Sequence, residues 1–178
     1  SSNSDDRLSW ILGAFYTENE TKFNSQWHVP PIPSDRKVPT SEDLYYQTDQ
    51  VRKDSEDAIF GELYYQLNDK TNITIGHRRF DNETKLNGFI GTILWPSRLV
   101  GSSTRPDNVN SVFKGKDSIT KLNIAYDVSD DTMIYLTKSE GYRPGGANRT
   151  QQLGATYDAD FLKNTEFGFK SIFSNGKA

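Results

Sequence analysis

Apolar and polar residues alternate along six stretches of the chain, and this period of two predicts β-strands rather than helices. The predicted strands lie near residues 7–20, 55–67, 70–84, 116–127, 132–142 and 161–173. Short polar links, Asn68-Asp69 and residues 128–131, suit hairpin turns, and Asn175-Gly176 predicts a further one. We therefore expect an all-β fold, an antiparallel up-and-down meander of about six long strands.

Three much longer links alternate with the short ones and cover residues 21–54, 85–115 and 143–160. Prolines in the first two predict irregular structure. Loops longer than about 12–15 residues are uncommon in a compact domain. Short turns on one side of a sheet and long loops on the other are typical of a transmembrane β-barrel, whose long loops are extracellular.

The alternation also predicts which side of each strand faces lipid. Apolar side chains share one parity in four of the strands: Ile59, Leu63 and Tyr65; Ile73 and Ile75; Leu122, Ile124 and Tyr126; Phe167 and Phe169. The opposite parity carries most of the charges and is expected to face the barrel interior. The stretches 7–20 and 132–142 are apolar on both parities, so the pattern assigns them no face.

Composition removes several other classes of protein. The chain of 178 residues has no cysteine, two histidines and a net charge of −3, which excludes disulfides and thiolate zinc sites and gives no electrostatic reason to expect nucleic-acid binding. No apolar run reaches the roughly 18 residues of a transmembrane helix. We find no catalytic motif, metal site or cofactor motif, so the chain is not expected to be an enzyme.

Five stretches also carry a family resemblance. They are residues 12–16 (LGAFY), 58–63 (AIFGEL), 73–78 (ITIGHR), 134–146 (IYLTKSEGYRPGG) and 165–170 (TEFGFK). In this order they resemble successive strand signatures of the TonB-dependent outer-membrane receptors. His77 departs from the pattern, because its parity predicts an apolar, lipid-facing residue.

The resemblance implies a barrel of about 22 strands in the outer membrane of a Gram-negative bacterium. It implies an N-terminal plug, energy supplied by TonB through that plug, and uptake of a ferric siderophore or a similar scarce nutrient. Residues 1–178 would then be a fragment of the barrel, with the plug absent. Its partners would be outer-membrane lipid, the remaining strands, the plug and a small-molecule ligand. A passive porin-like barrel and a soluble β-domain that binds carbohydrate through its long loops remain alternatives.

Ligand contacts are expected in the long loops, because such loops supply aromatic and cationic side chains. The candidates are Trp27, His28, Tyr45, Tyr46, Trp95, Arg98, Arg105, Arg143 and Arg149. Arginine suits an anionic ligand because it donates bidentate hydrogen bonds to carboxylates. The inward-facing residues Arg78, Lys121, Glu166 and Lys170 are instead expected to pair with one another or with the plug.

Overall fold

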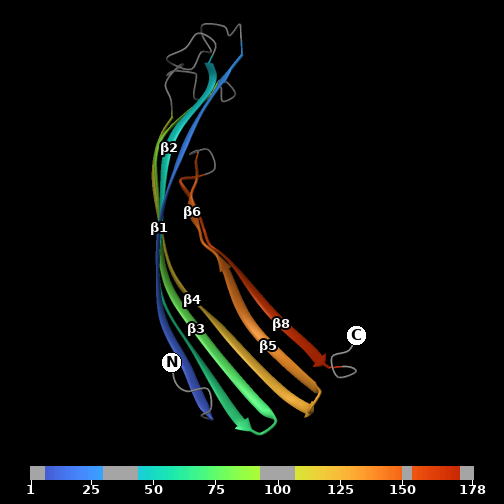
Figure 1. The fold of residues 1–178 in the computed structure, drawn as a ribbon. Helices are drawn as coiled ribbons and strands as arrows, with labels where there is room; N and C mark the ends of the chain where they lie inside the picture. The colour runs from blue at the N-terminus through green and yellow to red at the C-terminus, as the bar shows by residue number, and fades with distance from the viewer. Residues whose placement is uncertain (1–6, 30–43, 93–106, 150–153, 173–178) are drawn as a thin grey trace.

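Six antiparallel strands form one sheet in a computed structural model that describes residues 7–29, 44–92, 107–149 and 154–172 (Figure 1). The strands are β1 (Leu8–His28), β2 (Leu44–Asn68), β3 (Thr71–Thr92), β4 (Asp107–Ser129), β5 (Thr132–Arg143) and β8 (Asp160–Ser171). Each strand pairs with the next in chain order, from β1 to β5 and then β8. The predicted up-and-down meander is therefore confirmed. No helix in these ranges is long and apolar enough to cross a membrane.

The first four strands are longer than the sequence pattern predicts, at 21 to 25 residues each. Residues 21–28, 44–54, 85–92 and 107–115 were expected in loops and instead continue the strands. Cross-strand pairing continues through them, for example from Lys22 to Val51 and from Val51 to Asn87, so their backbone groups are satisfied by the ladder. The expected loop centres 30–43 and 93–106 lie outside the described residues.

Both predicted hairpins are present. Asp69 and Lys70 form the turn between β2 and β3, where the Asn68 side chain accepts a hydrogen bond of 2.9 Å from the Lys70 amide. Asp130 and Asp131 form the turn between β4 and β5. Asparagine and aspartate favour such turns because their side chains bond nearby backbone amides. The expected turn at Asn175-Gly176 lies outside the described residues.

The two faces of the sheet are distinct. All of the buried side chains in the paired regions of β2, β3 and β4 lie on one face of the sheet, which we call the inner face; they include Ala58, Phe80, Leu86, Ile90 and Val109. The opposite parity, the outer face, carries Trp10, Leu63, Ile75 and Leu122 in one cross-strand row. Because side chains alternate along a strand, the register assigns a face to the paired residues of β1 to β4, and to those of β5 as far as Ser139, where its pairing with β4 ends, together with their partners on β8.

The last two residues of β5 and the segment that follows them lie against the inner face, and this segment contains two two-residue strands, β6 (Gly146–Ala147) and β7 (Thr156–Tyr157). We call residues 142–149 and 154–157 the inner strap. Figure 1 shows β6 on the concave side of the sheet. Ala147 joins Leu86, Ile90 and Val109 in a buried cluster. The described part of 143–160, expected as an outward loop, therefore folds back along the wall.

Candidate functional site

We call the end of the sheet with the β2–β3 and β4–β5 hairpins the lower half, as oriented in Figure 1. The outer face of this lower half is a continuous apolar surface. One row crosses all six strands and consists of Leu8, Tyr65, Ile73, Ile124, Leu136 and Phe167. Many of its neighbours are exposed, with Ile59 at 63% and Phe169 at 67%. A soluble sandwich would bury these residues between two layers, and an exposed apolar area this wide marks a surface that contacts another apolar phase.

The register also assigns a face to the two strands that the pattern left open. On β1, the outer residues Leu8, Trp10 and Leu12 pair with outer residues of β2. On β5, Ile134 and Leu136 pair with Phe169 and Phe167 of β8. The apolar surface therefore extends without interruption from β1 to β8.

The upper border of this apolar surface runs obliquely across the strands. The last apolar residue before a polar one is Tyr16 on β1, Ile59 on β2, Ile75 on β3, Leu122 on β4, Leu136 on β5 and Phe167 on β8. Phe167 and Leu136 lie in the row of Leu8, which is eight positions below Tyr16 (16 − 8). Eight residues of about 3.3 Å over five strand spacings of about 4.8 Å give an angle of about 45°.

His77 lies at this border rather than inside the apolar surface. It pairs with Gly61 and Thr120, and its Nδ1 lies 3.3 Å from the Thr120 hydroxyl oxygen. Ile75 lies below it and Arg79 above it on the same face. The histidine is thus compatible with the predicted register, because it sits where apolar residues give way to polar ones.

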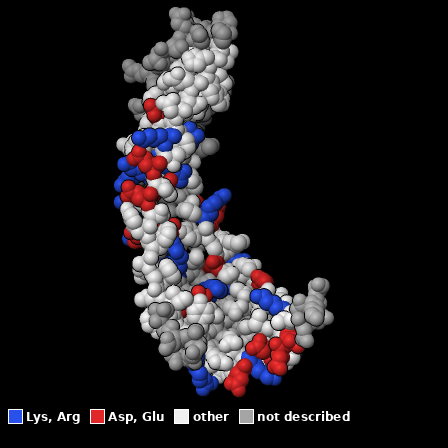
Figure 2. Space-filling view, viewed as in Figure 1, with Lys and Arg blue, Asp and Glu red and all other residues white. Residues whose placement is uncertain are grey.

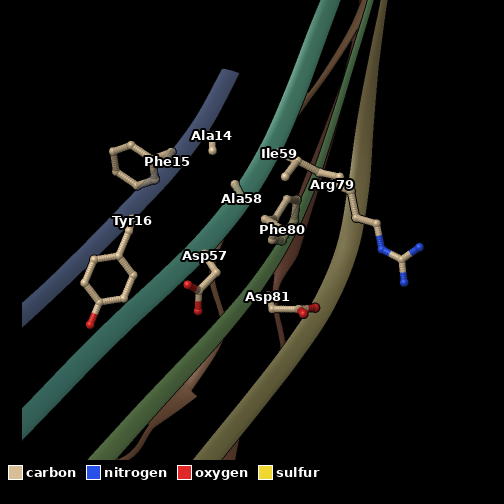
Figure 3. A pocket seen from close by; sticks show the side chains of 9 residues that line it. All are labelled: Ala14, Phe15, Tyr16, Asp57, Ala58, Ile59, Arg79, Phe80 and Asp81. Atoms are coloured by element: carbon tan, nitrogen blue, oxygen red, sulfur yellow. The ribbon is translucent and has the colours of Figure 1, made fainter. Parts of the chain in front are cut away.

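A shallow hollow of about 480 Å³ spans the border on β1 and β2 and extends to β3 just above the border. Figure 3 shows its side chains: Ala14, Phe15 and Tyr16 from β1, Asp57, Ala58 and Ile59 from β2, and Arg79, Phe80 and Asp81 from β3. Aliphatic and charged groups meet here within two rows of the sheet. Tyrosine at such a place is typical of an interface between lipid and water.

Above the border the outer face carries charges of both signs, and Figure 2 shows them gathered over the long strands. Glu20 accepts from Lys53 at 3.0 Å and Lys22 at 3.4 Å, while Glu83 pairs with Lys85 and with Lys114. Hydrogen bonds from these lysines lower the pKa of both carboxyl groups, with Lys53 the main cause at Glu20 and Lys85 at Glu83. This pattern is typical of a water-exposed surface.

The inner face of the lower half is polar and internally paired. Lys121 donates to Glu62 at 2.9 Å, and the Tyr135 hydroxyl donates to Glu166 at 2.6 Å. Lys170 lies over the Tyr135 ring at 5.6 Å. The residues predicted to face inward do so, and they pair with groups of this wall rather than directly with one another.

Tyr142 attaches the inner strap to the wall. Its ring stacks on Phe80 with centroids 3.8 Å apart, and its hydroxyl donates to Glu56 at 2.7 Å. Arg78 donates to the same carboxylate at 2.5 Å. Burial and the hydrogen bond to Glu56 raise the pKa of Tyr142 to about 12.

The Gly-Tyr-Arg-Pro-Gly-Gly stretch fits closely because its glycines have no side chain. A Cβ on Gly145 would lie 2.4 Å from the Phe113 ring and 2.6 Å from the Tyr157 carbonyl oxygen. Only glycine allows the strap backbone to approach the wall this closely. The stretch that carries the most specific part of the family resemblance therefore positions the strap.

Three of the predicted ligand residues meet at the upper end of β1 and β2. Trp27 lies 4.7 Å from Tyr46 and 5.8 Å from Tyr45 between ring centroids. A register shift after Trp27 inserts Tyr45 between the residues that pair with Trp27 and His28, which brings both tyrosines against one indole. His28 pairs with Leu44 and has no ring contact with this group among the described residues. We call Trp27, Tyr45 and Tyr46 the aromatic cluster.

The two predicted arginines of the third link have different surroundings. Arg143 forms an ion pair with Asp160 across β5 and β8, so its charge is compensated. Arg149 donates from Nε to the Gln50 side chain at 3.0 Å and lies 4.5 Å above the Phe23 ring. Trp95, Arg98 and Arg105 lie outside the described residues.

Several wall residues of this region were missed from sequence. Gln50, Phe23, Glu56 and Phe80 contact the strap residues Arg149 and Tyr142. Gln50 and Phe23 fall in the stretch expected to be a loop, and only the β1–β2 register shows that they are direct cross-strand partners. These contacts could have been predicted only if residues 21–28 and 44–54 had been recognised as continuing the strands.

Comparison with known proteins gives one similar solved structure. No protein-family model and no curated protein matches the chain. The crystal structure of the ferric yersiniabactin uptake receptor FyuA from Yersinia pestis matches with a TM-score of 0.73, over 97% of this chain, at 17% sequence identity. The chain has the fold of a receptor barrel segment.

This likeness confirms, for the fold, the resemblance to TonB-dependent receptor barrels that the strand signatures indicate. The chain spans 24% of the length of FyuA. The described six-stranded sheet therefore matches the fold of about a quarter of that receptor's chain. At this level of sequence identity the match supports the arrangement of the strands and assigns no role to any residue.

Proposed function

We propose that the chain is part of the wall of an outer-membrane barrel that takes up a scarce nutrient. The oblique border of the apolar outer face carries this proposal. Strands of membrane barrels tilt by about 35–45° from the barrel axis. A flat membrane surface therefore crosses neighbouring strands at successively lower residues, and the border from Tyr16 to Phe167 has this slope.

On β1 and β2 the apolar part of the outer face, which we call the belt, has the height that a bilayer requires. On β1 the apolar outer residues run from Leu8 to Tyr16, which is nine residues (16 − 8 + 1). A tilted membrane strand needs about 9–11 residues to cross the hydrocarbon core. The remaining residues of β1, from Thr17 to His28, would then stand outside the membrane.

The two edges of the sheet require further strands. Within the described residues, β1 pairs only with β2 and β8 only with β5, so each has one unpaired edge. Unpaired backbone groups are not tolerated in hydrocarbon. We infer that more strands of the same barrel, as well as lipid, are the immediate partners of this wall. The chain alone should aggregate in water.

We propose a ferric siderophore or a similar chelate as the nutrient, with a plug and TonB as further partners. The support is the family resemblance of residues 134–146 and the name of the similar structure, a ferric yersiniabactin uptake receptor. The aromatic cluster and Arg149 on the inner side suit such a ligand. The location would be the outer membrane of a Gram-negative bacterium.

Uptake of radiolabelled iron by cells that produce the full-length protein tests this proposal. We expect iron supplied as a chelate to accumulate in these cells and not in cells that lack the protein. A protonophore should stop the accumulation, because uptake through TonB uses energy from the inner membrane. Uptake that continues with the protonophore would favour a passive porin-like barrel. A protein recovered from the soluble fraction would contradict both.

A further inference from the structure

Three cations on the inner face of this wall are each compensated by a neighbouring carboxylate. Arg52 lies 2.8 Å from Asp54, Arg78 lies 2.5 Å from Glu56, and Lys121 lies 2.9 Å from Glu62. Arg149 differs from these three, since no carboxylate among the described residues pairs with it. Its charge is therefore available to an anion in the barrel interior.

Arg149 is nevertheless held in place. Gln50 is fully buried and bonds Arg149 twice, through its amide nitrogen to the Arg149 carbonyl oxygen at 2.9 Å and through its amide oxygen to Nε at 3.0 Å. The Arg149 Cζ atom lies over the Phe23 ring, 4.5 Å from the ring centroid. Of the guanidinium nitrogens, only Nε takes part in these hydrogen bonds. Within the described residues, the two terminal nitrogens, which can bind a carboxylate bidentately, have no hydrogen-bond partner.

Arg149 also lies close to the aromatic cluster on the inner wall. Its support Phe23 lies four residues below Trp27 on the same strand and the same face, a distance of about 13 Å along β1. Trp27 is half exposed, and Tyr46 packs on the buried apolar cluster beneath the strap. An aromatic surface and a fixed cation thus line the same inner wall at neighbouring levels.

We propose that Arg149 forms an anion-binding subsite for a carboxylate or other oxyanion of an iron chelate, with the aromatic cluster contacting the apolar part of the same ligand. The inference rests on the proposed function and makes it more specific, because it selects anionic chelates. A neutral glutamine supports an arginine without neutralising it, whereas glutamate at position 50 would form an ion pair with it.

Binding of two iron chelates of opposite charge to the purified full-length protein tests the subsite. Ferric citrate is the anionic probe and ferrioxamine B the cationic one. We expect Arg149→Gln to weaken ferric citrate binding by roughly tenfold to a hundredfold, the contribution of a hydrogen bond to a charged group. The affinity of Arg149→Lys for ferric citrate should lie between those of the wild type and Arg149→Gln, since lysine keeps the positive charge and cannot donate the bidentate hydrogen bonds of a guanidinium. Ferrioxamine B binding should not weaken.

Lys114→Gln is the matched control, because it removes one positive charge from the exposed outer face. It should leave ferric citrate binding unchanged. Equal ferric citrate binding by wild type and Arg149→Gln, or no binding by wild type at millimolar concentration, overturns the subsite. Insertion of each variant into lipid vesicles is measured in parallel. Normal insertion with unchanged binding rejects the subsite alone, whereas failure of the wild type to insert rejects the proposed barrel.

Discussion

The lower and upper halves of the same long strands have opposite polarity. In the lower half the outer face is apolar and the inner face carries paired polar groups such as Lys121 and Glu62. In the upper half the outer face carries ion pairs such as Lys53 with Glu20, while the inner face buries Leu86 and Val109 beneath the strap. One sheet thus meets two environments, and the change from one to the other follows an oblique line.

The inversion explains why strand length exceeds membrane thickness. A strand needs only about 9–11 tilted residues to cross the bilayer, yet β2 has 25. In the proposed barrel, lipid would cover the apolar outer face below the border, whereas above it the apolar residues of the inner face need cover from the protein itself. The inner strap does this for the upper inner face, where Ala147 closes the apolar cluster.

A charge placed on the outer face should have its largest effect below the border. Leu63 on β2 and Val112 on β4 are equally exposed, at 48% each, and both lie on the outer face. Leu63→Arg should lower the free energy of unfolding in bilayers by about 2–4 kcal/mol, because Leu63 lies near the middle of the belt. Val112→Arg should change it by no more than about 0.5 kcal/mol. Equal effects in denaturant titrations would remove the distinction between the halves.

Loss of a contact between the strap and the wall should have an intermediate effect. Tyr142→Phe keeps the stacking on Phe80 and removes the hydrogen bond to Glu56. Since the acceptor is charged, we expect the strap to lose about 1.5–3 kcal/mol of its attachment. Faster proteolysis within residues 142–157 of the folded protein would report this loss, and Tyr126→Phe on the outer face is the control. An unchanged cleavage rate would mean that the hydroxyl does not hold the strap.

Alkaline pH should weaken the same contact between Tyr142 and Glu56. The pKa of Tyr142 is raised to about 12, so its stabilisation is complete below its ordinary pKa of about 10 and is lost as the pH rises through the folded value. The phenolate absorbance of wild type minus Tyr142→Phe should therefore show a group that titrates near pH 12. A difference titration near pH 10 would place Tyr142 in water and contradict the contact with Glu56.

Acid should have the smallest effect at the exposed ion pairs above the border. Lysines lower the pKa of Glu83 in the folded protein, so its contribution is present above the unfolded pKa and is lost as the pH falls through the folded one. Glu83→Gln should flatten the decline of the melting temperature below about pH 4.5 slightly. A steeper decline in the variant would show that these exposed pairs do not stabilise the wall.

Sequence reasoning predicted the lower half of the fold better than the upper half. Below the border one face is apolar, so the alternation around Leu63 or Ile124 is visible in the sequence. Above it, the outer positions are charged, as at Glu20 and Lys53, and the inner positions are both apolar and polar. The alternation of apolar and polar residues therefore disappears from the sequence. Only the continuing backbone pairing shows that these residues are strands.

The candidate site was predicted in part. Trp27, Tyr45 and Tyr46 were chosen as aromatic residues of a loop, and a strand with a register shift brings them together instead. Arg143 and Arg149 were equivalent in sequence, and the structure separates them, because within the described part of the chain Arg143 pairs with a carboxylate and Arg149 does not. The strap itself could not be predicted, since its contacts join residues about a hundred positions apart, such as Gln50 and Arg149.

Spin-label accessibility along single cross-strand rows tests the oblique membrane border most directly, and the absence of cysteine makes single labels simple. Trp10 and Lys138 share one row, as do Ile59 and Ser118. In the full-length protein in bilayers, labels at Trp10 and Ile59 should be accessible to oxygen, and labels at Lys138 and Ser118 to a water-soluble nickel chelate. The same accessibility at both positions of each row would contradict an oblique border.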